Sequence, residues 1–281
     1  MPLFALLPKK ISGYRSRVHG QPAVSTWICP LKISIITVTY NSASTIRDTL
    51  ASVASQTHTD IEHIVIDGGS TDGTQALVAQ HGCRVSRMVS EPDKGIYDAM
   101  NKGLRLATGE YVGFLNGDDI YAAHDVVARI AETSARETPD AIYGDLVYVD
   151  PGRAKPVVRH WQAGEFARSR LKFGWMPPHP TLYVRRSVLD RIGPFDATLR
   201  IAADYEYMLR LLTEPGLTVA YIPHILVRMR IGGASNANIR SLMNKSKEDL
   251  LALRRHRVGG WPTLLLKNAR KLPQFLSKPT E

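Results

Sequence analysis

The sequence has few of the features that mark secreted, membrane-spanning or zinc-binding proteins. Its 281 residues include two cysteines, Cys29 and Cys83, too few for a disulfide framework, so we expect a cytoplasmic protein. No apolar run reaches the ~18 residues that span a bilayer. The first lysines, Lys9 and Lys10, follow an apolar stretch, which reverses the order of a secretory signal. No paired histidines or cysteines have the spacing of a zinc site.

Several catalytic and nucleotide-binding motifs are also missing. The chain has no G-x-S-x-G nucleophile motif, as found in many serine hydrolases. It has neither the G-x-G-x-x-G dinucleotide fingerprint nor the G-x-x-x-x-G-K-[ST] phosphate loop, although it contains Gly68 and Gly69. These absences count against a serine hydrolase, a dinucleotide-dependent enzyme and a phosphate-loop nucleotide hydrolase.

Acidic residues are scarce at both ends of the chain. Residues 1–32 contain five Lys/Arg and no acid, and residues 228–281 contain twelve Lys/Arg against three acids, within a net charge of +10. The middle of the chain is therefore mildly acidic. Because a nucleic-acid reader usually carries its basic stripe on the folded recognition surface, we expect no nucleic-acid partner. Basic ends suit an anionic membrane surface, or they are simply the solvated faces of surface helices.

Strand-like and helix-like segments alternate through the first half of the chain. Buried strands are predicted at Lys32–Tyr40, Ile61–Asp67, Arg84–Val89 and Tyr111–Leu115, each followed by a helical pattern. This order predicts an α/β fold with a mostly parallel central sheet flanked by helices. Shorter strands are expected at Ala141–Val149, Lys155–His160 and Thr218–Ile222, with helices at Ser187–Ile192 and Ala203–Leu212. We divide the chain into an irregular basic extension (1–31), a folded body (32–235) and a basic amphipathic helical tail (236–281).

Three polar clusters follow predicted strands at the point where each strand ends. They are Thr39-Tyr40-Asn41, Asp67-Gly68-Gly69-Ser70 and Asn116-Gly117-Asp118-Asp119. Because ligands of parallel α/β sheets bind beyond the carboxyl ends of the strands, we expect these clusters to meet on one rim.

The acids of this rim suit a nucleotide and a metal, although each also has a simpler explanation. The adjacent carboxylates Asp118 and Asp119 repel each other unless a cation such as Mg²⁺ or Mn²⁺ lies between them and phosphate oxygens. They would otherwise form a solvated turn that caps the next helix. Asp67 either accepts a hydrogen bond from a base or ribose, or it is a turn residue.

Three further residues are candidates for the acceptor side. Asp204 begins a predicted helix, where it is either a general base or an acid that the helix dipole favours. Glu206 lies two positions on and faces a different direction. His179, between two prolines, either contacts the acceptor or phosphate or has a structural role.

Five segments in this order are similar to those of one enzyme family. They are ITVTYN (36–41), VIDGGSTDGT (65–74), SEPDKGIYDAMNKG (90–103), GEYVGFLNGDD (109–119) and ADYE (203–206). The chain resembles the family 2 glycosyltransferases, which have the nucleotide-diphospho-sugar transferase fold called type A. The ADYE segment is similar to bacterial branches that act on polysaccharide or lipopolysaccharide sugars.

The resemblance implies a role for each matching residue. Thr39, Tyr40 and Asn41 would contact the nucleotide, and Asp67 would read its base, usually the uracil of a UDP-sugar. Asp93 and Lys94 would lie near the donor phosphates. Asn116 and Asp118 match the family's D-x-D motif, with Asp118 at the position that binds magnesium or manganese and Asp119 beside it. Asp204 would be the catalytic base. Separately from the resemblance, we place His179 and Glu206 on the acceptor side.

Two residues depart from the family pattern. Asn116 replaces the commoner first aspartate of the D-x-D motif, which weakens the case for metal dependence. Ala203 replaces a usual glutamate beside Asp204. The extension at 1–31 is also longer than is typical of the bacterial branch.

The implied reaction is a single displacement that inverts the anomeric carbon, with a saccharide or lipid-linked saccharide as acceptor in cell-surface polysaccharide synthesis. The body would then be a catalytic domain with a nucleotide-sugar-binding half (32–122) and an acceptor-side half (123–235). The basic tail would hold the enzyme peripherally at the inner face of the cell membrane. Two alternatives remain, a sugar-1-phosphate nucleotidyltransferase and a non-catalytic sugar-nucleotide-binding module.

Overall fold

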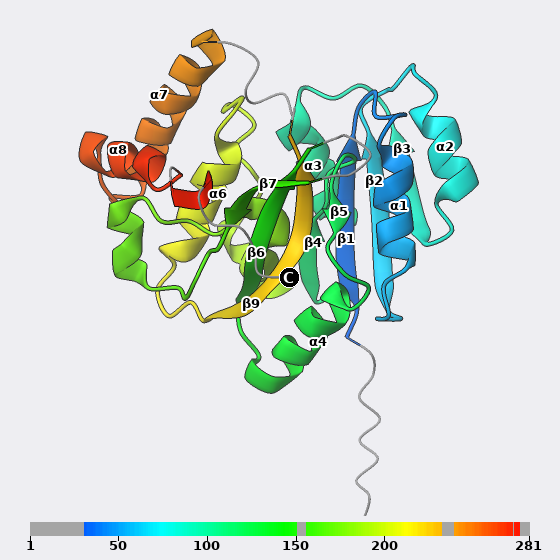
Figure 1. The fold of residues 1–281 in the computed structure, drawn as a ribbon, viewed down its shortest axis with the longest axis horizontal. Coiled ribbons are helices and arrows are strands. Elements are labelled where there is room, and N and C mark those ends of the chain that lie inside the picture. Colours follow the sequence, from blue (N-terminus) through cyan, green and yellow to red (C-terminus); the bar gives the residue numbers. More distant parts are fainter. Residues whose placement is uncertain (1–30, 151–155, 232–238, 272, 276–281) are drawn as a thin grey trace, which may run out of the picture.

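The computed structural model describes residues 31–150, 156–231, 239–271 and 273–275. The extension that we predicted at 1–31 lies, apart from Leu31, outside the described residues. The predicted α/β class is confirmed, because a central curled sheet carries helices on both faces (Figure 1).

The first half of the chain forms the parallel part of the sheet. Its strands run side by side in the order β3-β2-β1-β4 and alternate in sequence with three helices. The strands are β1 (Ile33–Thr39), β2 (Ile61–Asp67), β3 (Val85–Ser90) and β4 (Tyr111–Phe114), and the helices are α1 (Ile46–Ala54), α2 (Thr74–His81) and α3 (Ile96–Leu106). In register, Ile33 of β1 lies opposite Ile61 of β2 and Tyr111 of β4.

The second half of the chain extends this sheet with strands of mixed direction. The short β8 (Tyr183–Arg185) pairs antiparallel with β4 and with β6 (Ala141–Val149), and β6 pairs parallel with β9 (Val219–Arg230). Two further strands, β5 (Ile120–Tyr121) and β7 (Val157–Trp161), pair antiparallel with β9 and β6. The order β3-β2-β1-β4 is therefore parallel, and the strands that extend it are of mixed direction.

Strand β9 is longer than the sequence pattern indicates. We expected a strand to end at Ile222, but β9 continues to Arg230. The register against β6 shifts where Ile222 and Ile225 face the consecutive residues Gly144 and Asp145. Because proline cannot donate to the ladder, Pro223 is accommodated in this bulge, and the strand resumes beyond it.

Both faces of β1 are buried, which explains why most of its residues are apolar. Ile36 and Val38 share one buried cluster with residues of α3, α5 (Arg186–Ile192) and α6 (Ala203–Leu212), whereas Ile33 and Ile35 belong to the cluster that includes α4 (Val126–Glu137). Successive strand side chains point to opposite faces, so a strand covered on both sides is apolar on both faces.

The C-terminal region forms two helices that pack on the body. They are α7 (Ile239–Arg255) and α8 (Trp261–Ala269), which lie beside α6 in Figure 1. Leu250, Leu253 and Leu264 from these helices share one core with α6. Among the residues that the structure describes, no helix is both long and apolar enough to cross a bilayer.

A buried histidine links the first two strands. The His63 Nε2 atom lies 2.9 Å from the Thr37 hydroxyl, and burial lowers the pKa of His63 from 6.5 to about 4. The folded protein therefore holds this imidazole neutral, whereas the unfolded chain protonates it near pH 6.5. Because the unfolded state binds more protons below that pH, the free energy of unfolding falls as the pH drops from about 6.5 towards 4.

We predict that His63 accounts for about 2 kcal/mol of the stability lost between pH 7 and pH 5. Urea unfolding at the two pH values should show a smaller loss for His63→Gln than for the unchanged protein. The exposed His124 provides the control, and His124→Gln should leave the pH dependence unchanged. An equal loss in all three proteins would contradict a neutral buried His63.

Candidate active site

Three strand ends meet at one rim, as the sequence predicted. Thr39 at the end of β1 lies opposite Asp67 at the end of β2. The Gly68 amide donates to the Thr39 carbonyl over 2.9 Å, and the Gly117 amide donates to the Val38 carbonyl over 3.0 Å. These backbone bonds bring the three polar clusters together.

Asp67 is fully buried at the inner side of this rim. Its carboxylate accepts hydrogen bonds from the Ser70 amide over 3.0 Å, from the Ser70 hydroxyl and from the Ser90 hydroxyl over 2.6 Å. A carboxylate has about four lone-pair sites, so these three donors leave roughly one for a ligand.

The backbone beside Asp67 lies in a narrow space between two other site residues. A Cβ atom on Gly68 would come within 3.0 Å of the Asp93 Oδ2 atom and 3.3 Å of the Tyr40 ring. Tyr40 itself is 66% exposed, so its ring is available for contact with a ligand. The absence of a side chain at Gly68 lets the loops after β1, β2 and β3 meet.

Asn41 mainly connects these loops. It lies in the left-handed region at φ 47°, which asparagine tolerates better than most residues. Its amide donates to the Ser70 hydroxyl over 2.8 Å, and its Oδ1 atom accepts from the Thr71 amide over 3.0 Å. Its side-chain oxygen therefore orders the rim.

The loop before α3 carries Asp93 and Lys94. The Asp93 carboxylate forms an ion pair with Lys102, which also binds Glu91 over 2.9 Å. Lys94 has an exposed side chain, and its amide donates to Asp98 over 3.1 Å. Asp93 is therefore already paired, whereas the Lys94 ammonium is exposed beside the rim.

The two acids after β4 differ in environment. Asp118 is partly buried and its carbonyl accepts from Arg230 over 3.2 Å, while Asp119 is fully buried and accepts from the Asn116 amide group over 3.1 Å. Burial raises the pKa of both carboxyls, and the adjacent Asp118 charge raises the pKa of Asp119 further. Positive charge placed here would relieve this electrostatic cost.

Buried acceptor atoms at this point lack partners. Among the described residues, Thr39 Oγ1, Asn116 Oδ1 and Asp119 Oδ1 are buried without a hydrogen-bond partner. Carboxylate and amide oxygens suit Mg²⁺ or Mn²⁺, so the residues present fit a divalent cation. The same part of the chain holds no group of three or more His, Cys, Asp or Glu side chains that would form a complete cage. This is compatible with Mg²⁺, which usually keeps several ligands from water and phosphate.

Asp204 lies at the start of α6, where two donors orient it. The Tyr205 amide donates to Asp204 Oδ1 over 2.8 Å, and the Tyr97 hydroxyl lies 3.2 Å from the same oxygen. Tyr97 also lies 2.7 Å from the Ile201 carbonyl, so its hydroxyl is shared between the two acceptors. Asp204 is partly exposed, which leaves its second oxygen available for chemistry.

An aromatic cluster connects the end of β4 to Asp204. His179 stacks on Phe114 with ring centroids 5.4 Å apart, and both contact Phe195. Burial lowers the pKa of His179, while Asp204 opposes that shift. Burial raises the pKa of Tyr148, and the charges of Asp119 and Asp204 raise it further. Tyr148 is therefore within electrostatic range of both acids.

Glu206 has a different environment from Asp204. Its side chain is buried, lies 2.8 Å from His256 Nε2 and accepts from Arg210 over 3.0 Å. These partners, together with nearby Arg255, lower its pKa against the effect of burial. Glu206 therefore connects α6 to the end of α7, and the function proposed below gives it no role with the acceptor.

Three residues that contact the site were not predicted from the sequence. Tyr97 lies within one of the segments similar to the family, so the sequence contained a signal that could have identified it. Tyr148 on β6 and Arg230 at the end of β9 carried no motif. They reach the site only because β6 and β9 pair beside the parallel strands.

Solved structures of other proteins are similar to this fold. Mannosyltransferase PcManGT from Pyrobaculum calidifontis, solved with GDP-Man and Mn²⁺, is 22% identical with a TM-score of 0.60 over 88% of this chain and 73% of its own. TarS from S. aureus, solved with UDP-GlcNAc, is 21% identical with a TM-score of 0.65 over 81% of this chain and 66% of its own. These similarities define the fold as that of the type A glycosyltransferases.

Sequence comparison then identifies the family. The model of "Glycosyl transferase family 2" matches residues 34–193. A PGL/p-HBAD biosynthesis glycosyltransferase of Mycobacterium bovis (strain BCG / Pasteur 1173P2) is 34% identical over 209 residues, which is 72% of this chain and 78% of the relative. The chain belongs to glycosyl transferase family 2.

We predict that Tyr97→Phe lowers the turnover of sugar transfer by about tenfold, the size of one lost interaction of ~1.4 kcal/mol, without changing donor KM. The change removes the hydroxyl that orients Asp204 but leaves the ring in place. Tyr207→Phe is the matched control, because its buried hydroxyl has no partner among the described residues and its ring packs on the same Phe195. Steady-state kinetics would contradict the assignment if both variants lost turnover equally.

Proposed function

We propose that the protein transfers a sugar from a nucleoside-diphosphate donor to a saccharide or lipid-linked saccharide acceptor, with inversion at the anomeric carbon. The observation that supports this most strongly is the series of contacts from Phe114, at the end of the strand before the acid pair, through Phe195 to Tyr97, whose hydroxyl orients Asp204. A diphosphate beside the acid pair would leave its sugar between that pair and Asp204.

The donor that we propose is a UDP-sugar bound across the rim. Asp67 retains roughly one acceptor site for a base N–H, and the exposed Tyr40 ring lies next to Gly68. The UDP-GlcNAc complex of TarS supports this choice, although the mannosyltransferase with GDP-Man has a similar fold. The Lys94 side chain would approach the donor phosphates.

In the proposed mechanism Asp204 takes the proton of an acceptor hydroxyl. The hydroxyl oxygen then bonds to the anomeric carbon as the bond from that carbon to the diphosphate oxygen breaks. Attack opposite the leaving group inverts the configuration. Tyr97 and the Tyr205 amide hold Asp204 at Oδ1 during this step. A bound Mg²⁺ or Mn²⁺ would be held by Asp118, with Asp119 as the adjacent carboxylate. It would supply positive charge to the leaving diphosphate.

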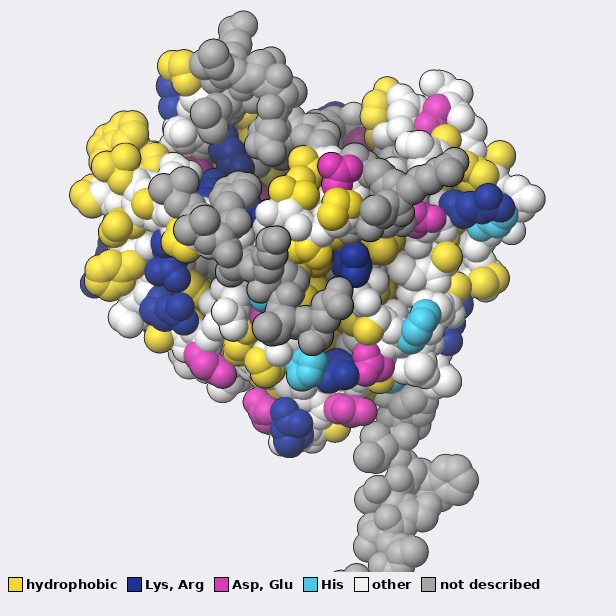
Figure 2. Space-filling view, in the orientation of Figure 1, with side chains coloured by type: hydrophobic (Ala, Val, Ile, Leu, Met, Phe, Trp, Pro, Cys, Tyr) yellow, Lys and Arg dark blue, Asp and Glu magenta, His cyan; other side chains and the backbone are white. Residues whose placement is uncertain are grey.

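We further propose that α8 holds the enzyme against the inner face of the cell membrane, where it acts in cell-surface polysaccharide synthesis. Exposed apolar side chains occur on α8 and on the adjoining η1 (Arg168–Phe173): Phe173, Trp261, Leu265 and Leu266. Figure 2 shows hydrophobic side chains at the edge where Figure 1 places α8, with Lys and Arg side chains below them. An exposed apolar group beside cations suits an anionic bilayer surface.

We predict that one nucleotide sugar binds in the presence of Mn²⁺ or Mg²⁺ and is bound at least tenfold more weakly in EDTA. Calorimetry across UDP-, GDP- and dTDP-sugars would identify it. Asp118→Ala should lose the metal-dependent part of the affinity. Asp204→Asn should bind the donor normally and lose transfer by at least a hundredfold, the usual scale for a general base.

Two outcomes would reject this function. If no nucleotide sugar binds with either metal, the protein does not use this donor class. If the donor binds but Asp204→Asn keeps full transfer, Asp204 is not the base. Release of diphosphate from a nucleoside triphosphate and a sugar phosphate would instead indicate a nucleotidyltransferase.

The membrane proposal is tested by sedimentation with vesicles that contain phosphatidylglycerol. Leu265, which is 68% exposed, is the most exposed of these apolar residues, so Leu265→Glu should weaken binding by tenfold or more. Ile96→Glu is the control, because Ile96 is exposed at the start of α3, which Figure 1 shows apart from α8. Equal sedimentation of both variants, or failure of the unchanged protein to sediment, would refute the proposal.

A further inference from the structure

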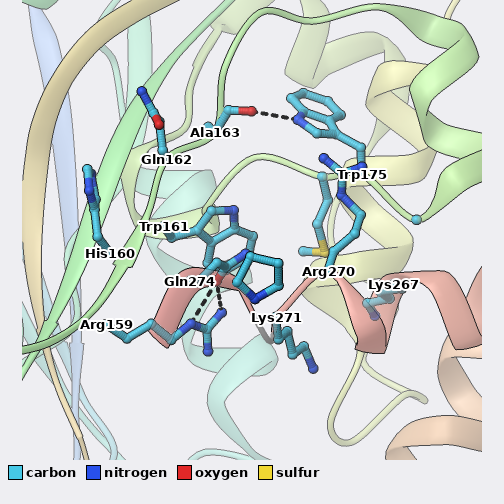
Figure 3. A pocket seen from close by; sticks show the side chains of 13 residues that line it. Arg159, His160, Trp161, Gln162, Ala163, Trp175, Lys267, Arg270, Lys271 and Gln274 are labelled. Carbon is cyan, nitrogen blue, oxygen red and sulfur yellow. Dashed lines mark hydrogen bonds between the residues drawn. The ribbon is translucent and has the colours of Figure 1, made fainter. Parts of the chain in front are cut away.

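A cavity lies in the second half of the chain, away from the nucleotide rim. It has a volume of about 450 Å³ and lies between β7, the segment around Trp175, α8 and the residues of η4 (Pro273–Phe275). Figure 3 shows Arg159 and Trp161 on one wall, Trp175 on another, and Lys267, Arg270 and Lys271 along a third. None of the rim residues lines it.

The charged side chains that line this cavity are all basic. Arg159, Lys267, Arg270 and Lys271 line it together with His160, and none of the lining residues, all in the described part of the chain, is acidic. Asp249 lies 2.7 Å from Lys267 and offsets that one charge. Burial and the charges of Lys245 and Lys267 lower the pKa of Lys271 to about 8. Arg270 and Lys271 therefore bring positive charge that no lining residue offsets, and an anion would relieve the repulsion.

The walls of the cavity are already ordered. The Gln274 Oε1 atom accepts from the Arg159 Nε atom over 2.7 Å, and Arg159 also lies over the Trp161 ring at 5.5 Å. The Trp175 indole donates to the Ala163 carbonyl over 2.8 Å, as the dashed lines of Figure 3 show. A fixed guanidinium costs little entropy when it binds a charged oxygen.

One residue of the cavity lies against the helix that carries Asp204. The Lys267 ammonium lies 3.3 Å from the centroid of the Tyr205 ring, and Tyr205 follows Asp204 directly in the chain. The Asp204 charge opposes the lowering of the Lys267 pKa by burial. From Trp175 the chain continues within four residues to His179, which packs beside β4. A molecule in the cavity would therefore lie on the Asp204 side of the reaction.

We propose that this cavity binds a phosphate or diphosphate group carried by the acceptor. Arginine and lysine side chains are the usual ligands of phosphate oxygens. The volume falls in the range of ligand pockets, about 300–1,000 Å³, which leaves room for the group attached to the phosphate. The tryptophan walls offer apolar surface to that group. The assignment of this group to the acceptor rests on the proposed transfer reaction, whereas the binding of an anion in the cavity does not depend on it.

The test is tryptophan fluorescence, because Trp161 and Trp175 both line the cavity. The probes are inorganic diphosphate and farnesyl diphosphate, titrated in EDTA so that metal-dependent binding at the rim is suppressed. We expect both probes to bind, and the double variant R270Q/K271Q to bind them at least tenfold more weakly. The control K247Q/R254Q removes the same charge from exposed positions of α7 and should stay within twofold of the unchanged protein.

The charge-conserving variant R270K/K271R guards against a folding defect, and it should keep most of the affinity. Equal weakening of R270Q/K271Q and K247Q/R254Q, or no binding of either probe, would overturn the proposal. Farnesyl diphosphate should bind at least tenfold more tightly than inorganic diphosphate. Equal affinity for the two would overturn the assignment to an acceptor-borne group.

The same variants separate this inference from the proposed function. R270Q/K271Q should bind the nucleotide sugar with unchanged affinity, because its altered residues lie outside the rim. If diphosphate binds in the cavity but no nucleotide sugar binds at the rim, the proposed transfer fails while the anion site stands. If the nucleotide sugar is bound and turned over but the cavity binds neither diphosphate, the anion site alone fails.

Discussion

The parallel pairing of β1 with β2 and β4 is the constraint on which the rest of this structure depends. It aligns Thr39 with Asp67 and brings Gly117 to the end of β1. Because parallel strands point the same way, their polar ends must share one edge. The loops at that edge then pack closely against one another, as the close approach of Gly68 to Tyr40 and Asp93 shows.

Electrostatic cost is concentrated at the acids of that edge and in the separate cavity near α8. Asp118 and Asp119 are carboxyls whose pKa burial raises, among acceptors without partners, and the cavity near α8 is lined by basic side chains and no acid of the described chain. Each is unfavourable in isolation, and each would be relieved by a ligand of opposite charge. Buried charge of this kind often marks functional sites. Asp204, oriented by Tyr97, is the third acid of the candidate site.

Much of the rim could be predicted because its information is local. A polar residue directly after a buried strand needs only the strand period and a parallel sheet to be placed, which suffices for Thr39, Asp67 and Asp118. Glu206 shows the limit of such reasoning, since its partner His256 is fifty residues away. The predicted end of β9 at Ile222 failed for a related reason, because pairing with β6 carries the strand past Pro223.

The sequence alone determined the α/β class, the alternation of parallel strands with helices, and the acids at the ends of those strands. Side-chain periodicity and turn chemistry act over a few residues, so a local pattern is enough to reveal them. The similarity of its segments to family 2 glycosyltransferases added their expected roles. Only the tertiary structure decided that Tyr97 orients Asp204, that Arg230 contacts the Asp118 loop, and that α8 closes a basic cavity against β7. These contacts join residues about a hundred positions apart, and chain packing, which no local pattern encodes, brings them together.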